Sequence, residues 1–378
     1  MWIELLSVVV LVISMAYLLV MTIITIGWFS LDKSVPSPGN AQKKMTVLVA
    51  ARNEEHTIEN LLKSLEQQHY SKALFKIVIV DDHSSDQTFE VMTNYVQTHA
   101  DLNIKVIKAI GHGKKAALKQ GMSLTKTALI ITTDADCIVP PGWLQNYANA
   151  FDNEEVSLVL APVVYQQKRR ILQKLMTLEF FSLVASGAGA AGIRLPFMGN
   201  GANMAFTRQV YESGVEDKGY YRYTSGDDVF LIHHTFRYFG RKSIRFLLKK
   251  EVLVETPPPD SLSQFIKQRL RWASKAKGYQ SPVAIVVSLV VLLTNSMLAV
   301  LFFSGFWLNW LWWIYTLLML MKILIDIPLV YGYAGFAQRN DLKKWFIPFS
   351  FIYPFYVILV GMASLVVSIS WKDRRFSR

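Results

Sequence analysis

The chain has 378 residues, 52% of them hydrophobic, with a mean hydropathy of +0.27 and a formal net charge of +12 at pH 7. This apolar content exceeds what a soluble domain needs, so we expect part of the chain to lie in lipid. The charge would suit nucleic acid, but the Lys and Arg residues gather beside the apolar stretches, which indicates a membrane protein and no nucleic-acid partner. The single cysteine, Cys137, excludes an internal disulfide and fits a reducing, cytosolic setting.

The first apolar stretch, Trp2 to Phe29, is almost uncharged and long enough to cross a hydrocarbon core of ~30 Å. A signal peptide is the alternative, but no basic residues precede the stretch and no A-x-A-like site follows it. We therefore expect an uncleaved membrane anchor.

Three more apolar stretches follow late in the chain, at about Val283 to Phe303, Trp307 to Tyr331 and Trp345 to Trp371. Between them and the anchor lies a block of mixed polarity that is large enough to bury one core. The expected organisation is an anchor over residues 1–30, a globular domain over 43–260, an amphipathic interface segment over 261–281, membrane helices over 282–371 and a basic tail over 372–378.

The basic residues beside the apolar stretches, at Lys33, Lys43-Lys44, 267–277, 339–344 and 372–378, follow the positive-inside pattern. This predicts an integral membrane protein with the globular block in the cytoplasm. If each of the four stretches crossed once, the basic tail would lie outside, against the same rule. One stretch is then expected to be re-entrant. The last is the best candidate, because Pro348 and Pro354 interrupt it.

Strands and helices are expected to alternate in the globular block. Short apolar runs predict strands at 45–51, 76–80, 103–107 and 128–132, and amphipathic patterns predict helices that include 88–95 and 114–124. This order predicts an α/β domain around a mostly parallel sheet, whose ligands bind at the carboxyl ends of the strands.

Acidic clusters follow three of these strands, the first of them at Glu54-Glu55. Asp134 and Asp136 are spaced to share a hard cation such as Mg²⁺ or Mn²⁺, although an acidic turn would look the same. Asp81 and Asp82 could accept the imide N–H of a pyrimidine, or could simply cap the following helix.

Other candidate residues lie further along the chain. Lys114 and Lys115 open a helix, where a nearby diphosphate would offset their unfavourable interaction with the helix dipole. The loop 197–206 is rich in small residues that let backbone approach a ligand. In the Ser225-Gly226-Asp227-Asp228 segment an aspartate could cap a helix or act as general base.

A basic segment, Gln268-Arg269-Leu270-Arg271-Trp272, lies just before the late apolar stretches. It could be an interfacial helix with a Trp anchor. Alternatively, Arg271 could bind a diphosphate and Trp272 could stack on a sugar ring. The flanking segments, Leu172 to Leu183 and Leu262 to Ala276, are both expected to be amphipathic.

The ordered set of motifs resembles that of the membrane-bound glycosyltransferases of family two, which include cellulose, chitin, hyaluronan and poly-N-acetylglucosamine synthases and ceramide glucosyltransferases. That family has an N-P-N-E-like loop, paired aspartates, D-x-D, a T-E-D or G-D-D motif and Q-x-x-R-W. This chain has Ala51-Arg52-Asn53-Glu54-Glu55, Asp81-Asp82, Asp134-Ala135-Asp136, Gly226-Asp227-Asp228 and the Gln268 to Trp272 segment in the same order. Arg52 departs from the family's usual Tyr or Pro.

The resemblance implies a GT-A fold and inverting transfer from a nucleotide sugar, most simply a UDP-sugar, with Mg or Mn as cofactor. It implies a catalytic base at Asp228 and a metal site at Asp134 and Asp136. It also implies donor-binding residues, which are Ala51, Arg52, Glu54, Asp81, Asp82, Lys115, Asp134, Gln268 and Arg271. The implied acceptor-binding residues are Gly199, Asn200, Gly201, Asp227 and Trp272.

The acceptor remains open. Four apolar stretches offer little room for a polymer channel, so a lipid or lipid-linked acceptor at the membrane surface comes first. A polysaccharide synthase that completes its channel with a second copy or an accessory subunit is the main alternative. A dolichyl-phosphate-sugar synthase and a non-catalytic membrane scaffold that binds nucleotide sugar are further alternatives. The first typically lacks Q-x-x-R-W, and the intact acidic positions argue against the second.

Overall fold

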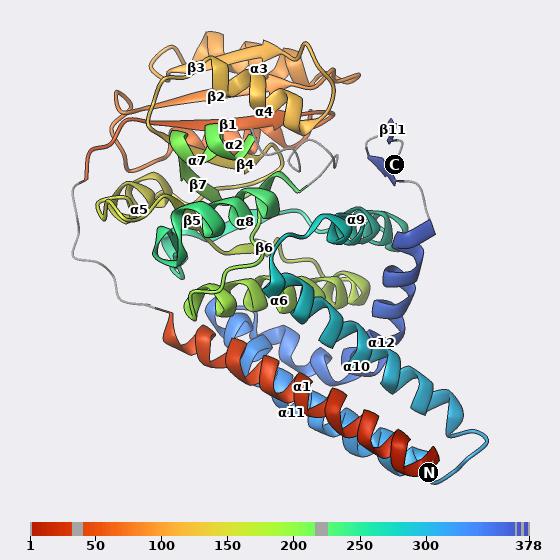
Figure 1. Cartoon of the computed structure of the whole chain (residues 1–378). Coiled ribbons are helices and arrows are strands. Elements are labelled where there is room, and N and C mark those ends of the chain that lie inside the picture. Colours follow the sequence, from red (N-terminus) through yellow and green to blue (C-terminus); the bar gives the residue numbers. More distant parts are fainter. Residues whose placement is uncertain (1, 32–40, 216–225, 367–368, 372–373, 377–378) are drawn as a thin grey trace.

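The computed structural model describes residues 2–31, 41–215, 226–366, 369–371 and 374–376. Ser225 and most of the expected basic tail lie outside the described residues. The domain forms the upper part of the molecule in Figure 1, and long helices form the lower part.

The domain contains a sheet of seven strands in the order β3-β2-β1-β4-β7-β5-β8. The strands are β1 (Met45–Ala51), β2 (Phe75–Asp81), β3 (Ile104–Lys108), β4 (Leu129–Asp134), β5 (Leu158–Leu160), β7 (Met204–Thr207) and β8 (Ile244–Phe246). The first four are mutually parallel, and β7 runs antiparallel between β4 and β5. A small parallel pair, β6 (Val163–Tyr165) and β9 (Val254–Thr256), lies beside the sheet.

Seven helices of the domain connect and cover these strands. They are α2 (Ile58–Glu66), α3 (Thr88–Thr98), α4 (Lys114–Ser123), α5 (Trp143–Ala150), α7 (Arg208–Val215), α8 (Asp227–Phe239) and α9 (Leu262–Ser274). Three short 3₁₀ turns, η1 (Arg241–Ser243), η2 (Lys250–Val252) and η3 (Lys275–Gly278), complete the described connections. The strands β1 and β2 are apolar along most of their length because both of their faces are buried.

Among the described residues, five helices are long and apolar enough to cross a membrane, by length and composition. They are α1 (Trp2–Ser30), α6 (Ile171–Gly192), α10 (Pro282–Ser304), α11 (Leu311–Phe336) and α12 (Lys343–Val366). Four correspond to the expected apolar stretches. The fifth, α6, contradicts the expected amphipathic segment at Leu172 to Leu183, because the six consecutive residues from Met176 to Phe181 are all buried.

Helix α6 lies between the sheet and the other long helices (Figure 1). It packs against α1 through glycines: a Cβ on Gly27 would collide with the backbone of Gly189, and one on Gly192 would collide with the backbone of Gly27. The two helix backbones therefore touch, which only glycine permits. The expected anchor is thus packed directly against the helix beneath the domain.

Helix α12 starts and ends on the side of the domain (Figure 1). It follows η4 (Asn340–Leu342), next to which Arg339 donates a hydrogen bond to the carbonyl oxygen of Tyr165 at 3.3 Å. After α12, strand β10 (Ile369–Trp371), which pairs with β11 (Arg374–Phe376), contacts α9. The chain therefore returns to its starting side, as a re-entrant segment would.

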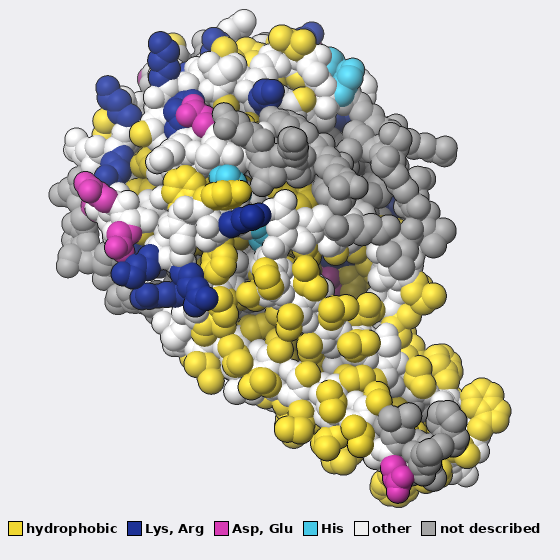
Figure 2. Space-filling model, viewed as in Figure 1, with side chains coloured by type: hydrophobic (Ala, Val, Ile, Leu, Met, Phe, Trp, Pro, Cys, Tyr) yellow, Lys and Arg dark blue, Asp and Glu magenta, His cyan; other side chains and the backbone are white. Residues whose placement is uncertain are grey.

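The long helices carry an apolar surface, which is yellow in the lower part of Figure 2. The turn between α10 and α11 lies at the end farthest from the domain, and there Trp307 and Trp313 are each 80% exposed. Exposed Trp at the end of apolar helices is typical of a membrane–water interface.

Candidate active site

A cavity of about 1280 Å³ lies at the carboxyl edge of the sheet and continues among the long helices. Its lining includes most of the candidate residues. Those on the lining are Ala51, Arg52, Glu54, Asp82, Asp134, Asp136, Gly199, Asn200, Gly201, Asp227, Asp228, Gln268, Arg271 and Trp272. Asp81 and Lys115 are the two candidates that are not on this lining.

The two aspartates after β2 have different surroundings. Asp81 is buried, and its carboxylate accepts hydrogen bonds from the backbone N–H of Ser84 at 3.2 Å and from the Ser84 hydroxyl. Asp82 lines the cavity, and both of its carboxylate oxygens lie 3.0 Å from the backbone nitrogen of Gly113. Of the pair, Asp82 is the one placed to meet a ligand, and Asp81 shapes the loop.

Arg52 braces the same loop. Its guanidinium donates to the carbonyl oxygens of Asp82 and His83, each at 2.7 Å. The chain at His83 has a left-handed backbone conformation, with φ of +56°, which is uncommon for a residue other than glycine. Arg52, which stands where the family usually has Tyr or Pro, therefore holds the left-handed conformation at His83 in place.

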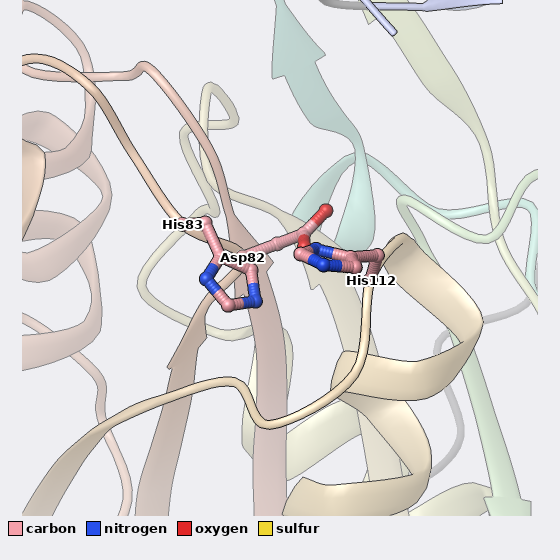
Figure 3. Close-up of side chains that lie close together, drawn as sticks. All are labelled: Asp82, His83 and His112. Carbon is pink, nitrogen blue, oxygen red and sulfur yellow. The ribbon is translucent and has the colours of Figure 1, made fainter. Parts of the chain in front are cut away.

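Two histidines that the sequence analysis missed lie beside Asp82 (Figure 3). Ligand atoms of Asp82, His83 and His112 lie within 4.8 Å of one another, and the two exposed imidazole rings have centroids 4.3 Å apart. One carboxylate with two imidazoles suits a transition metal better than Mg²⁺. A signal existed in the sequence, since His83 follows Asp82 directly and His112 is next to Gly113.

Asp134 and Asp136 both line the cavity after β4 and are half-buried. The ammonium of Lys114 lies 2.6 Å from Asp134 Oδ1, and the Cys137 thiol donates to Asp136 Oδ1 at 3.6 Å. Burial raises the pKa of the Cys137 thiol, which therefore stays a neutral donor. Two carboxylates that face the cavity and already attract a cation suit a hard divalent ion, so these residues fit the implied metal.

Lys114, and not Lys115, reaches the cavity. The Lys114 ammonium also lies 3.8 Å from Asp227 Oδ2; burial alone would lower its pKa, but Asp134 and Asp227 raise it overall, so it stays charged. Lys115 is buried, and its ammonium lies 5.2 Å from the centre of the Phe230 ring. Burial lowers the pKa of Lys115 to about 8, although Asp227 and Asp228 oppose the shift.

Asp228 lies in the first turn of α8, after Gly226, whose φ is +93°. Its Oδ2 accepts a hydrogen bond from the backbone N–H of Gly201 at 3.3 Å, and its Oδ1 lies 3.2 Å from the Lys275 ammonium. Burial would raise the pKa of Asp228, but Lys275 and the backbone N–H of Val229 outweigh it and lower the pKa. The carboxylate is therefore ionised at neutral pH.

Helix α9 presents Gln268, Arg271 and Trp272 to the cavity. Burial lowers the pKa of Arg271, although Asp134, Asp227 and Asp228 oppose the shift. Sequence pattern did not reveal the role of Arg269, whose Nε lies 2.9 Å from both carboxylate oxygens of Glu179 on α6. Trp272 lies on this buried ion pair, with its ring 4.3 Å from the Arg269 guanidinium carbon. The expected amphipathic helix therefore buries a guanidinium on its inner face.

Part of the domain is similar to a known family. Residues 46–214, which extend from β1 to the end of α7, carry a match to the family model described as glycosyl transferase family 2. The match ends before Asp227, Asp228 and the Gln268 to Trp272 segment.

Two curated relatives are similar over part of their length. Beta-monoglucosyldiacylglycerol synthase of Trichormus variabilis is 31% identical over 143 residues, which are 35% of this chain and 30% of that protein. Poly-beta-1,6-N-acetyl-D-glucosamine synthase of Staphylococcus aureus is 27% identical over 252 residues, 65% of this chain and 57% of that protein. The chain thus spans less than two thirds of either relative.

A solved structure is similar over almost the whole chain. The mannosyltransferase PcManGT from Pyrobaculum calidifontis, in complex with GDP-Man and Mn²⁺, aligns with a TM-score of 0.60 and 17% identity, and the alignment covers 96% of this chain and 99% of that one. This likeness confirms the expected α/β GT-A fold with additional long apolar helices.

Proposed function

We propose that the protein is an integral membrane glycosyltransferase that transfers a sugar, with inversion, from a nucleotide diphosphate sugar to a lipid acceptor. One observation carries the proposal: a single cavity joins the acidic edge of the sheet to the long apolar helices. A polar donor and an acceptor in the bilayer could meet there without either leaving its own medium. The family match and both curated relatives agree with sugar transfer.

The orientation also supports action at the cytoplasmic face. If α1, α10 and α11 cross the bilayer and α12 returns to its starting side, the basic segment Arg339 to Lys344 and the basic strand β11 (Arg374–Phe376) lie on the side of the GT-A domain. With these segments on the same side as the domain, the positive-inside rule supports a cytoplasmic domain.

The donor site in this proposal is the edge of the sheet formed by β1, β2 and β4. Asp82 would accept the imide N–H of a uracil, and Lys114 and Arg271 would bind the diphosphate. Lys114 takes the role that the resemblance gave to Lys115, because its ammonium faces the cavity. A Mg²⁺ or Mn²⁺ held by Asp134 and Asp136 would neutralise charge on the diphosphate.

Asp228 is the proposed base. Its carboxylate takes the proton of the acceptor hydroxyl as the hydroxyl oxygen bonds to the anomeric carbon and the bond to the diphosphate oxygen breaks. The attack comes from the face opposite the leaving group, which inverts the anomeric configuration. Lys114 and Arg271 stabilise the charge that develops on the diphosphate. Gly199, Asn200, Gly201, Asp227 and Trp272 line the space for the acceptor.

The test is to incubate the purified protein with UDP- and GDP-sugars, Mn²⁺ and a bacterial lipid extract, and to identify products by mass spectrometry. A lipid that carries one added sugar supports the proposal. Release of free sugar alone would contradict it, and no consumption of any donor would leave the scaffold alternative standing.

A polysaccharide synthase is the second candidate, because the longer of the two curated alignments is to a poly-beta-1,6-N-acetyl-D-glucosamine synthase. Such an enzyme would need a second copy or an accessory subunit to complete a channel. Long chains in the same assay would favour it over the lipid acceptor.

A further inference from the structure

Three polar side chains form a cluster among the long helices, far from the sheet. On α11, the Lys322 ammonium lies 2.6 Å from Asp326 Oδ2. From α1, the Tyr17 hydroxyl lies 2.7 Å from Asp326 Oδ1 and 2.9 Å from Asp326 Oδ2. Lys322 and Asp326 are only 3% and 8% exposed. We call these three residues the intramembrane cluster.

The intramembrane cluster lies deep along its helices. Asp326 precedes Phe336, where α11 ends beside the domain, by ten residues, or about 15 Å of helix. Charges at such a depth in a bilayer are expensive, and they usually face a cavity or a ligand pathway. A purely structural contact between these helices could have been made by apolar side chains at lower cost.

The intramembrane cluster does face a cavity, since Tyr17, Lys322 and Asp326 line the same space as Asp134 and Asp228. Between the two ends the wall includes Glu179, Tyr353 and Tyr356, and the Tyr356 hydroxyl donates to Glu179 Oε1 at 3.0 Å. Apolar residues of α10, α11 and α12, such as Val291, Leu329 and Phe349, surround the inner end.

The hydrogen-bonding capacity of the intramembrane cluster favours one kind of ligand group. An ammonium has three donors, and the bond to Asp326 uses one of those on Lys322. The Lys322 ammonium also faces the rings of Tyr353 at 5.0 Å and Tyr17 at 5.6 Å. A neutral acceptor of hydrogen bonds, such as a carbonyl or hydroxyl oxygen, can use the remaining donors without adding a charge.

We propose that the intramembrane cluster binds a carbonyl or hydroxyl oxygen in the hydrophobic portion of the lipid acceptor, while the reacting hydroxyl lies at Asp228. This inference rests on the proposed function and adds a second polar contact to it. A lipid that is bound at both points cannot slide along the cavity. The cluster therefore selects acceptors by the distance between that oxygen and the reacting hydroxyl. A plain hydrocarbon chain would leave the Lys322 donors facing apolar groups and would bind less well.

The test uses the double variant Lys322→Met/Asp326→Leu, which removes both charges together and so leaves neither unpaired. Asn295→Leu is the matched control, because Asn295 is a buried polar residue of α10 that does not line the cavity. Transfer of labelled sugar into vesicles of bacterial lipid extract gives the KM for acceptor, and titration with UDP gives donor binding. Native mass spectrometry in detergent shows whether lipid co-purifies.

We expect the double variant to raise the KM for acceptor at least tenfold and to lose co-purified lipid, while the Kd for UDP changes less than twofold. Tyr17→Phe keeps the ion pair but removes the hydroxyl that donates to Asp326 and positions it, and we expect about a threefold rise in KM for acceptor. If the double variant fails to fold, this single variant decides.

Wild-type KM values for acceptor in the folded variants would overturn the inference and leave the cluster a structural contact. Absence of any lipid product from the wild type would instead overturn the proposed function. The two failures are therefore distinguishable.

Discussion

The ion pair Lys114–Asp134 at the sheet edge differs from the pair Arg269–Glu179, which joins α9 to α6, in how far water and ligands can reach it. At the edge, the side chains of Lys114 and Asp134 are 22% and 39% exposed. Deeper, those of Arg269 and Glu179 are 3% and 4% exposed. A partly exposed pair can exchange its partner for a ligand at little cost, whereas a buried pair must stay together. The Lys114–Asp134 pair therefore suits chemistry and the Arg269–Glu179 pair suits support of α9 and α6, and the variants below probe this difference.

The largest expected effect is on the base. We expect Asp228→Asn to lower the transfer rate about a thousandfold, because the amide cannot take the acceptor proton. Donor binding should stay near the wild-type value, since the variant keeps the shape of the site. Initial rates and UDP titration measure the two quantities, with Glu212→Gln, exposed on α7, as a control. Undiminished turnover would refute the assignment of Asp228.

Breaking the buried pair should affect stability first. We expect Glu179→Gln to lower the free energy of unfolding by about 3 to 5 kcal/mol, because it leaves the Arg269 charge buried without a carboxylate. Thermal unfolding in detergent measures the loss. Replacing both partners in Glu179→Leu/Arg269→Met should recover much of it. A stable Glu179→Gln variant would show that this pair is no more supportive than those at the edge.

The metal proposal is tested at the sheet edge. We expect EDTA to abolish transfer and Mn²⁺ or Mg²⁺ to restore it. Asp136→Asn should lower the rate about a hundredfold, as for loss of one electrostatic contact with a transition state. Replacing both exposed histidines in His83→Gln/His112→Gln should leave the metal requirement unchanged. If this histidine variant instead needs a much higher Mn²⁺ concentration for activity, and Asp136→Asn does not, the ion belongs at Asp82, His83 and His112.

Lys275 lowers the pKa of Asp228, so its removal should move the pH dependence of transfer. The base must be ionised, and activity therefore falls as the pH drops through the pKa of Asp228. In Lys275→Met that pKa rises, and we expect the acidic limb of the profile to shift up by about one pH unit. If the acidic limb does not move, it reports the titration of a group other than Asp228.

The smallest effect concerns Lys115. Its pKa of about 8 means that it is charged below that pH and loses its charge as the pH rises through it. Above pH 8 we expect Lys115→Arg, which stays charged, to be about two- to threefold more active than the wild type, the modest effect of a charge outside direct contact. Lys119→Arg, exposed on the same helix, is the control. If the wild type and Lys115→Arg have the same pH–activity profile above pH 8, the charge of Lys115 has no effect on transfer.

The sequence predicted those parts of the fold that depend on local pattern. The strand Met45–Ala51 has the expected bounds, because β-branched and small apolar residues run between polar segments. The pattern failed at α6, where apolar residues on all sides reflect burial between two layers that lie far apart in the sequence. It also gave no hint that α12 ends beside α9.

The candidate site shows the same limit. The acidic residues at strand ends could be found because a parallel sheet brings its strand ends together. Choosing Lys114 over Lys115 required the direction of each side chain at the start of α4, which spacing does not give. The pairing of Arg269 with Glu179 joins residues 90 positions apart, and only the packed structure brings them together.

The glycine contact between α1 and α6 has a practical consequence for protein production. Removing the first helix to obtain a water-soluble fragment would uncover Gly189 and Gly192 and would delete Tyr17 and Met21 from the cavity wall. Such a fragment would open the reaction chamber to water, where an activated sugar can be hydrolysed. The first helix is therefore part of the cavity wall. Crystallisation or screening should use detergent-solubilised protein that keeps this helix.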